Sequence, residues 1–259
     1  MGGNSHFLRG ASLPLSLFLL WLVGDQLAWW PLYVVPSPQA VGSAFFSLWA
    51  SGDLMKHITV SFFRVFAGFM LAFTGAISLA VLLALKPIWR SYTTALLEFI
   101  RHVPPLAALP MLILWFGIGE MPKILIVILA TFFPIFLNTL QGFLQCDPKL
   151  QEVGKTYQFN EWECFYHITL PAALPAILLG MQLGLGYSWR ALIGAELIAA
   201  SSGIGYLILD AEQLARPDIV VIGIVTIGLI GSLIDWIFFY ITRKLIPWAQ
   251  GGESDYGRR

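Results

Sequence analysis

Gly154, Lys155 and Thr156 are the residues that come nearest to a nucleotide-binding motif in this chain. In a phosphate-binding loop of the form GxxxxGK[ST], backbone N–H groups, the lysine and the hydroxyl surround the phosphates and Mg²⁺. That pattern requires a glycine at position 149, where this chain has Lys149, and it requires a preceding β-strand. We therefore predict that this chain binds neither ATP nor Mg²⁺, and that any ATP it uses is bound by another subunit.

Three ionisable residues interrupt long apolar runs: Arg190, Glu196 and Asp235. On insertion scales a charge at the bilayer centre costs at least about 2.5 kcal/mol, so such a residue indicates a partner or a pathway. Arg190 and Glu196 are six positions apart, about 240° around a helix, and therefore have different neighbours. Our hypothesis is that Arg190 lines a translocation path and attracts an anionic solute. The alternative is a structural ion pair or hydrogen bond with another helix.

Other polar residues indicate a functional role less strongly. Glu196, Ser201 and Ser202 are further candidates for the translocation path, and the two serines precede glycines that suit a re-entrant turn. Glu98 and Arg101 are three positions apart and are interpreted as a structural pair on one helix face. No GxSxG or HExxH motif and no metal-ligand spacing of cysteines occurs, so we predict no catalytic residue, no metal and no enzymatic activity.

The composition indicates the elements that carry these residues. Apolar residues make up 58% of the 259 and charged residues 12%, against about 45 to 50% and about 25% in soluble domains. Such a chain is a membrane protein in contact with lipid. Its formal net charge is zero, which does not favour binding of nucleic acid.

The apolar runs predict an all-α integral membrane protein with about six crossings, since a crossing needs about 20 apolar residues. The runs are 13–30, 62–85, 94–117, 122–144, 173–200 and 218–241. The third is interrupted by Pro104 and Pro105, which mark a bend beside His102. We expect one permease domain over 1–259, with its core at about 54–243.

Lysine and arginine in short loops predict the orientation, because they are retained on the cytoplasmic side. One side carries nine: Arg9, Lys86, Arg90, Lys149, Lys155, Arg243, Lys244, Arg258 and Arg259. The other side carries three: Lys56, Lys123 and Arg216. Both termini and the polar loop at 145–171 are therefore predicted to be cytoplasmic.

The loop at 145–171 is predicted to fold as a compact helix-turn-helix between the fourth and fifth crossings. Asp147 before Pro148 is a strong helix start, because the carboxylate caps a helix whose first residue needs no N–H. That helix should end at about Tyr157. Asn160 and Glu163 form a variant capping box, so a second helix should begin there and extend towards Ile168.

The loop also resembles the cytoplasmic loop of the membrane subunits of ABC importers. The pattern there is Glu-Ala-Ala, three residues, Gly, nine residues and Ile-x-Leu-Pro. Glu152, Gln158, Ile168, Leu170 and Pro171 stand in that register. The blocks PPLAALPMLILWFGIGE (104–120) and GAELIAASSGIGYLILDA (194–211) are similar to the nitrate, sulfonate and taurine branch.

The chain departs from this pattern at three positions. Val153 and Gly154 replace the two alanines, and Gln158 replaces the glycine. A left-handed backbone at Gln158 would cost about 1 kcal/mol, unless the turn moves towards Asn160. The fold of the loop should be kept.

The resemblance implies a permease subunit in a bacterial inner membrane that carries a small, anionic solute such as a sulfonate, taurine or nitrate. Its implied partners are an ATP-hydrolysing subunit, an extracytoplasmic solute-binding protein, a second permease copy and membrane lipid. The residues implied to dock the ATPase are Glu152, Val153, Gly154, Lys155, Thr156, Tyr157 and Gln158. The alternatives are the same machinery carrying a heterocycle like a thiamine precursor, and a secondary transporter driven by an ion gradient.

Overall fold

The computed structural model describes residues 3–247, with side chains from Ser12 onward. The side chain of Arg9 and all of Arg258 and Arg259, which entered the charge comparison, lie outside the described residues. Within 3–247 the regular structure is entirely helical. The helices are α1 (Gly3–Gln26), α2 (Pro38–Ser51), α3 (Asp53–Leu85), α4 (Pro87–Arg101), η1 (Pro105–Ala108), α5 (Leu109–Phe116), α6 (Glu120–Leu144), α7 (Pro148–Thr156), α8 (Glu161–Cys164), η2 (Phe165–Thr169), α9 (Leu170–Ala199), α10 (Ile204–Gln213) and α11 (Pro217–Leu245).

The all-α membrane class is confirmed, but the number of candidate crossings is smaller than six. Four helices of the described chain are long and apolar enough to cross: α3, α6, the continuous helix from α8 to α9, and α11. A fifth is added if the bent pair of α4 and α5 counts as one span. The first predicted run is helical in α1, yet its described apolar part, Ser12–Gln26, is too short to qualify.

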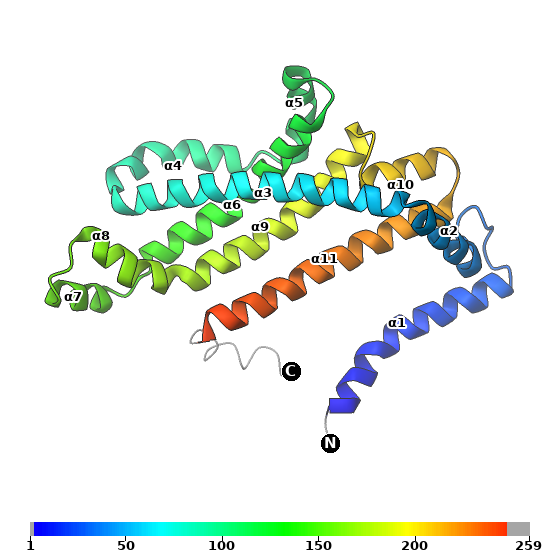
Figure 1. Ribbon diagram of the computed structural model, residues 1–259, viewed down its shortest axis with the longest axis horizontal. Coiled ribbons are helices and arrows are strands. Elements are labelled where there is room, and N and C mark those ends of the chain that lie inside the picture. Colours follow the sequence, from blue (N-terminus) through cyan, green and yellow to red (C-terminus); the bar gives the residue numbers. More distant parts are fainter. Residues whose placement is uncertain (1–2, 248–259) are drawn as a thin grey trace.

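Three of the long helices, α3, α6 and α9, form the centre of the bundle (Figure 1). α6 packs along both of the others and supplies Ile135 and Phe136 to the largest buried apolar cluster. Gly180 and Gly184 allow α9 to approach α6 closely, because a methyl group at these positions would lie 3.0 Å from the Pro134 carbonyl oxygen and 3.2 Å from the Thr131 carbonyl oxygen. Small residues serve this purpose between membrane helices.

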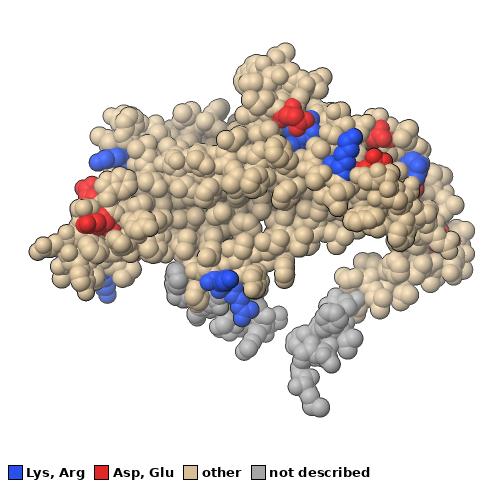
Figure 2. Space-filling model, in the orientation of Figure 1, with Lys and Arg blue, Asp and Glu red and all other residues tan. Residues whose placement is uncertain are grey.

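The two ends of the bundle differ. α7 and α8 lie at one end, which we call the α7 end, whereas α2 and α10 lie at the opposite end, the α10 end (Figure 1). Figure 2 shows that charged atoms on the visible face gather near the ends of the long helices, while the middle of the bundle is almost free of them. This distribution is the one expected of a protein that crosses a bilayer.

α3 begins nine positions before the predicted start at residue 62. Gly52, with a left-handed φ of 79°, ends α2 and directly precedes Asp53, the first residue of α3. The preceding α2 is capped by Ser37, whose side chain accepts a hydrogen bond from the Ala40 N–H at 3.1 Å. Because the first turns of α3 are polar, an apolar run alone places its start too late.

The third predicted crossing, 94–117, is not one straight helix. α4 ends at Arg101, and α5 follows after the Pro104–Pro105 pair at an angle of 85°. Proline lacks the N–H that would continue the helical bonds and obstructs the preceding turn. The bend expected beside His102 is therefore confirmed, and it is sharp enough to redirect the chain.

The fifth predicted crossing, 173–200, is longer at its start than expected. α8, η2 and α9 form one continuous helix over Glu161–Ala199, so the second helix of the predicted helix-turn-helix is the first part of a membrane helix. The segment Phe165–Thr169 is a π-helix. We attribute this widened turn to Pro171, which cannot bond to the His167 carbonyl oxygen and pushes it aside.

Candidate functional site

The loop at the α7 end begins and turns as the sequence predicts. The Asp147 side chain accepts a hydrogen bond from the Lys149 N–H at 2.9 Å and caps α7. The Asn160 side chain accepts from the Glu163 N–H at 2.9 Å, while the Glu163 carboxylate accepts from the Asn160 N–H at 2.8 Å. This reciprocal pair is a complete capping box at the start of α8.

α7 packs on the rest of the loop through Gly154. Gly154 is buried, and a methyl group added there would lie 2.7 Å from the Ile168 Cδ1 atom and 3.2 Å from the Cys164 Sγ atom. The second alanine of the importer pattern would therefore require the end of the Ile168 side chain to move. The other predicted docking residues, Glu152, Val153, Lys155, Thr156, Tyr157 and Gln158, are exposed.

An apolar stripe lies on the exposed surface of α7 and its C-terminal cap. It comprises Leu150, Val153 and Tyr157, whose exposed fractions are 47%, 49% and 71%. Their i, i+3, i+7 spacing places them on one side of the helix. Leu150 and Val153 also border a small notch against His167, Ile168 and Pro171. An exposed helix with apolar anchors at this spacing is suited to lie in a groove of a partner protein.

Gln158 adopts the left-handed backbone that the importer pattern gives to glycine. Its φ is 57°, its N–H donates to the Lys155 carbonyl oxygen at 3.0 Å, and the Phe159 N–H donates to the Gly154 carbonyl oxygen at 3.0 Å. The turn has not moved towards Asn160, so the chain accepts the strain of a non-glycine residue here.

Gln158→Gly is expected to stabilise the α7 loop by about 1 kcal/mol, because glycine adopts a left-handed backbone without the steric cost. The matched control is Gln151→Gly inside α7, which should destabilise by about 1 kcal/mol because glycine is a poor helix former. Limited proteolysis of the purified protein, measured at the loop, should rank Gln158→Gly slowest and Gln151→Gly fastest. The reverse order would show that the loop gains nothing from a flexible backbone at 158.

A buried ionic network at the α10 end is centred on Arg64, whose side chain is 1% exposed. Its Nε and Nη2 atoms donate to the Glu120 carboxylate, the latter at 2.7 Å. Its Nη1 atom donates to Glu196 Oε1 at 2.7 Å and to the Ser202 carbonyl oxygen at 2.6 Å, and Nη2 also donates to Ser202 Oγ at 3.0 Å. With Lys123 Nζ 3.0 Å from Glu120 Oε1, two cations and two anions balance each other.

Glu196 is fully buried, and its carboxylate is held by three groups of the described chain. Its carboxylate accepts hydrogen bonds from Arg64, from the Ser61 hydroxyl at 2.9 Å and from the Gly205 N–H at 3.0 Å. Gly203, with a φ of 112°, packs directly on that carboxylate, and a Cβ atom there would overlap it. The network therefore fixes the turn that joins α9 to α10.

The structure places the four candidates for the translocation path in different surroundings. Glu196 and Ser202 belong to the buried network, which favours a structural role for both. Ser201 is exposed at the α10 end, and Arg190 lies on a different side of α9. Arg64 was missed from the sequence, although an arginine eleven positions into a long apolar helix is itself a signal for a buried partner.

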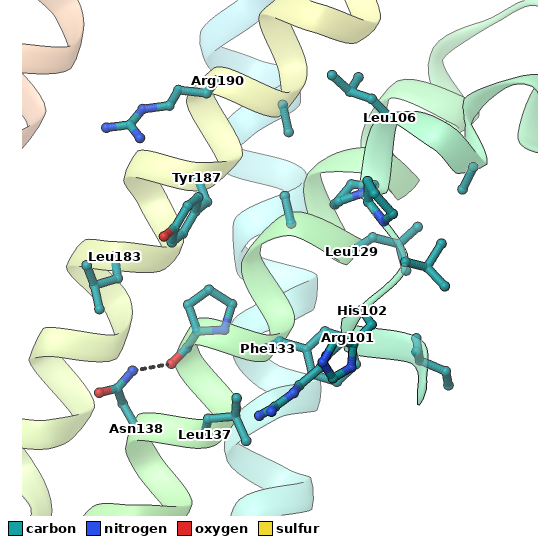
Figure 3. Close-up of a pocket in the computed structure, with 18 residues that line it drawn as sticks. Arg101, His102, Leu106, Leu129, Phe133, Leu137, Asn138, Leu183, Tyr187 and Arg190 are labelled. Carbon is teal, nitrogen blue, oxygen red and sulfur yellow. Dashed lines mark hydrogen bonds between the residues drawn. The ribbon is translucent and has the colours of Figure 1, made fainter. Parts of the chain in front are cut away.

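Arg190 lines a groove with a volume of about 770 Å³. Figure 3 shows its walls: α9 carries Leu183, Tyr187 and Arg190, and α6 carries Phe133 and Asn138. Arg101 at the end of α4 and His102, its C-cap, complete the lining on the third side. The remaining lining residues are Ile100, Val103, Pro104, Pro105, Leu106, Ala108, Leu129, Ala130, Pro134, Leu137 and Ala191. The groove is mainly apolar, and no aspartate or glutamate is among these described lining residues.

The two arginines of the groove have no anionic partner among the described residues. The Arg190 guanidinium lies 6.0 Å from the centre of the Tyr187 ring, a weak cation–π contact. Arg101 forms no ion pair with Glu98, so the structural pair expected on α4 is absent from the described structure. Asp235, the third charge singled out in an apolar run, is exposed on α11.

Comparison with known proteins assigns the family. The profile described as binding-protein-dependent transport system inner membrane component matches residues 72–247. A Bacillus subtilis (strain 168) protein named for aliphatic sulfonate transport, SsuC, is 36% identical over 96% of this chain and 90% of its own length. Its Escherichia coli (strain K12) counterpart is 36% identical over 91% and 90%. The taurine transport system permease protein TauC of Escherichia coli is 31% identical over 92% and 88%.

A solved structure supports the same fold at low sequence identity. A chain of the MetNI methionine ABC transporter in inward-facing conformations superposes with a TM-score of 0.57 at 15% identity, covering 74% of this chain and 94% of that chain. The family match covers most of the chain, and the expected permease subunit is confirmed. This chain belongs to the binding-protein-dependent transport system inner membrane components, the multi-pass permease subunits of ABC importers.

Proposed function

We propose that this permease subunit imports a small organic anion. The observation that supports the proposal best is the groove beside α9, where Arg190 and Arg101 lie on membrane-associated helices without carboxylate partners. A guanidinium in hydrocarbon is costly, so both arginines must face water, a solute or another protein. A path lined by cations attracts anions and repels cations. The names of the similar proteins, which mention aliphatic sulfonates and taurine, agree with this chemistry.

A second copy of the chain is proposed to close the groove. Arg190 and Tyr187 are exposed in the single chain, and lipid is a poor environment for an uncovered guanidinium. Pairing of two permease domains would exclude lipid and leave a shared aqueous path between them. We therefore propose a homodimer, with the groove facing its centre.

The α7 end is proposed to face the cytoplasm and to dock the ATP-hydrolysing subunit. The stripe Leu150, Val153 and Tyr157 supplies the apolar anchors, and Glu152, Lys155, Thr156 and Gln158 supply polar contacts around them. The α10 end, including Ser201, is then the surface that meets the extracytoplasmic binding protein. We propose that α1 crosses the membrane as well, so that both termini lie in the cytoplasm, as the distribution of lysine and arginine indicates.

Co-expression with candidate ATPase subunits tests this proposal. We expect a complex containing two copies of this chain, and proteoliposomes holding that complex should accumulate a sulfonate only with ATP and a binding protein. A matched preparation without the ATPase should transport nothing against a gradient. Uphill transport by the chain alone, or failure of any ATPase to co-purify, would contradict the proposed function.

A further inference from the structure

The groove carries positive charge at two separate levels. Figure 3 shows Arg190 at one end of the α9 wall and Arg101 across from Leu183 and Asn138, closer to the other end. Leu183 and Arg190 are seven residues apart, which is about 10 Å along a helix. Arg101 forms no hydrogen bond or ion pair within residues 12–247, so both guanidiniums are available to a ligand.

The surface between these two cations is hydrocarbon. Leu129, Phe133, Leu137 and Leu183 line it, and Tyr187 contributes the face of its ring. Such a wall gains free energy by covering an apolar group and gains nothing by covering a hydrated inorganic ion. Its position between the cations suits a ligand with one anionic end and a short alkyl chain.

The same lining disfavours a zwitterion. A ligand with an ammonium group, such as taurine, requires a carboxylate or several carbonyl acceptors to replace its water. The described lining residues include no aspartate or glutamate, and the Pro134 carbonyl oxygen is already bonded to Asn138 Nδ2 at 2.8 Å. An ammonium in this groove would lie near two guanidiniums, with no carboxylate among the described lining residues to offset the repulsion.

We propose that Arg101 and Arg190 are two successive stations for the anionic group of an aliphatic monoanion of the alkanesulfonate class, whose chain lies on the leucine and phenylalanine wall. The inference rests on the proposed function and deepens it, because it assigns Arg101 as a second specificity-determining residue of the path. Selection against zwitterions then occurs in the permease itself, independently of the binding protein.

Thiol modification in the groove tests the charge. A single cysteine is placed by Leu183→Cys in a chain with Cys146→Ser and Cys164→Ser, assembled with its ATPase. Two methanethiosulfonate reagents of similar length are compared, one ending in a sulfonate and one in a quaternary ammonium. We expect the sulfonate reagent to react faster by about tenfold, after correction for their rates with a free thiol, because a cationic cleft concentrates anions.

Substitutions at Arg101 and at Arg190 test the two proposed stations one at a time. Arg101→Gln and Arg190→Gln should each lower the rate ratio about threefold, and the double variant should bring it close to one. Arg101→Lys and Arg190→Lys should keep the ratio high, and Arg216→Gln, a matched change at the α10 end outside the groove, should leave it unchanged. A ratio that neither arginine affects would overturn the inference, even if the complex still assembles and transports.

Protection by ligands tests whether the alkyl chain of the solute contacts the apolar wall. Butanesulfonate should slow modification of the Leu183→Cys thiol, whereas taurine and nitrate at the same concentration should not. Equal protection by taurine would overturn the selection against zwitterions, and equal protection by nitrate would overturn the role of the apolar wall. ATP-driven uptake by the unmodified complex is measured in parallel, so a failure of the proposed function is recognised separately.

Discussion

Glu196→Leu is expected to destabilise the folded protein by about 3 to 5 kcal/mol, because it removes the buried one of the two carboxylates that pair with the buried Arg64. Arg64 would keep only Glu120 and Ser202 as partners, and the Gly205 N–H and Ser61 hydroxyl would lose their acceptor. The turn between α9 and α10 would then lose the carboxylate that the Gly205 N–H and Arg64 bind. Thermal unfolding in detergent, followed by size-exclusion chromatography, should show a much lower midpoint.

Two controls identify the cause of that loss. Glu120→Gln should have a much smaller effect, since the Glu120 side chain is 57% exposed and water can hydrate what the change leaves unpaired. The double variant Arg64→Met with Glu196→Leu should recover part of the midpoint, because apolar residues can replace a buried ion pair. If the double variant lost as much stability as the two single variants lose together, the charge balance would not be the reason for the defect.

Val153→Asp is expected to abolish ATP-driven transport while leaving the membrane bundle folded. The substitution puts a carboxylate into the exposed stripe Leu150, Val153 and Tyr157, which is proposed to lie in an apolar groove of the ATPase. Burying an unpaired carboxylate costs several kcal/mol, so the amount of co-purified ATPase should fall by about a hundredfold or more, at about 1.4 kcal/mol per tenfold change.

The matched control for this variant is Leu214→Asp, which introduces the same charge at an exposed leucine of the α10 end. That change should leave the amount of co-purified ATPase as in the unchanged protein. Both variants should elute from size-exclusion chromatography at the volume of the intact permease. Normal recovery of the ATPase with Val153→Asp would show that α7 docks through a different face.

Local features of the sequence predicted local features of the structure well. The caps at Asp147 and Asn160 and the bend at Pro104 and Pro105 are all present. Each depends on residues within about four positions of one another, so no knowledge of the fold is needed to foresee it. The departure at Gly154 could be noticed in the sequence, but the close packing of Gly154 on Ile168 was visible only in the structure.

Element boundaries were predicted less well where polar residues lie inside a helix. The polar start of α3 and the continuation of α8 into α9 were both missed. Apolar composition reports which part of a helix contacts lipid or the core, whereas hydrogen bonding along the backbone decides where the helix ends. α2 and α10 were missed for a different reason, because they are too short to give a membrane signal.

The sequence by itself determined that the chain is a helical membrane protein with a folded polar loop, because composition and short-range spacing carry that information. Its resemblance to the loop of ABC importers implied the permease subunit. Only the tertiary structure decided the roles of the charges. Arg64 and Glu196 are 132 positions apart, and their pairing depends on which helices pack and at what depth. Helical periodicity tells which residues share a face of one helix, but it does not identify the facing helix. The structure thus placed Glu196 in a buried network and Arg190 with Arg101 in one groove.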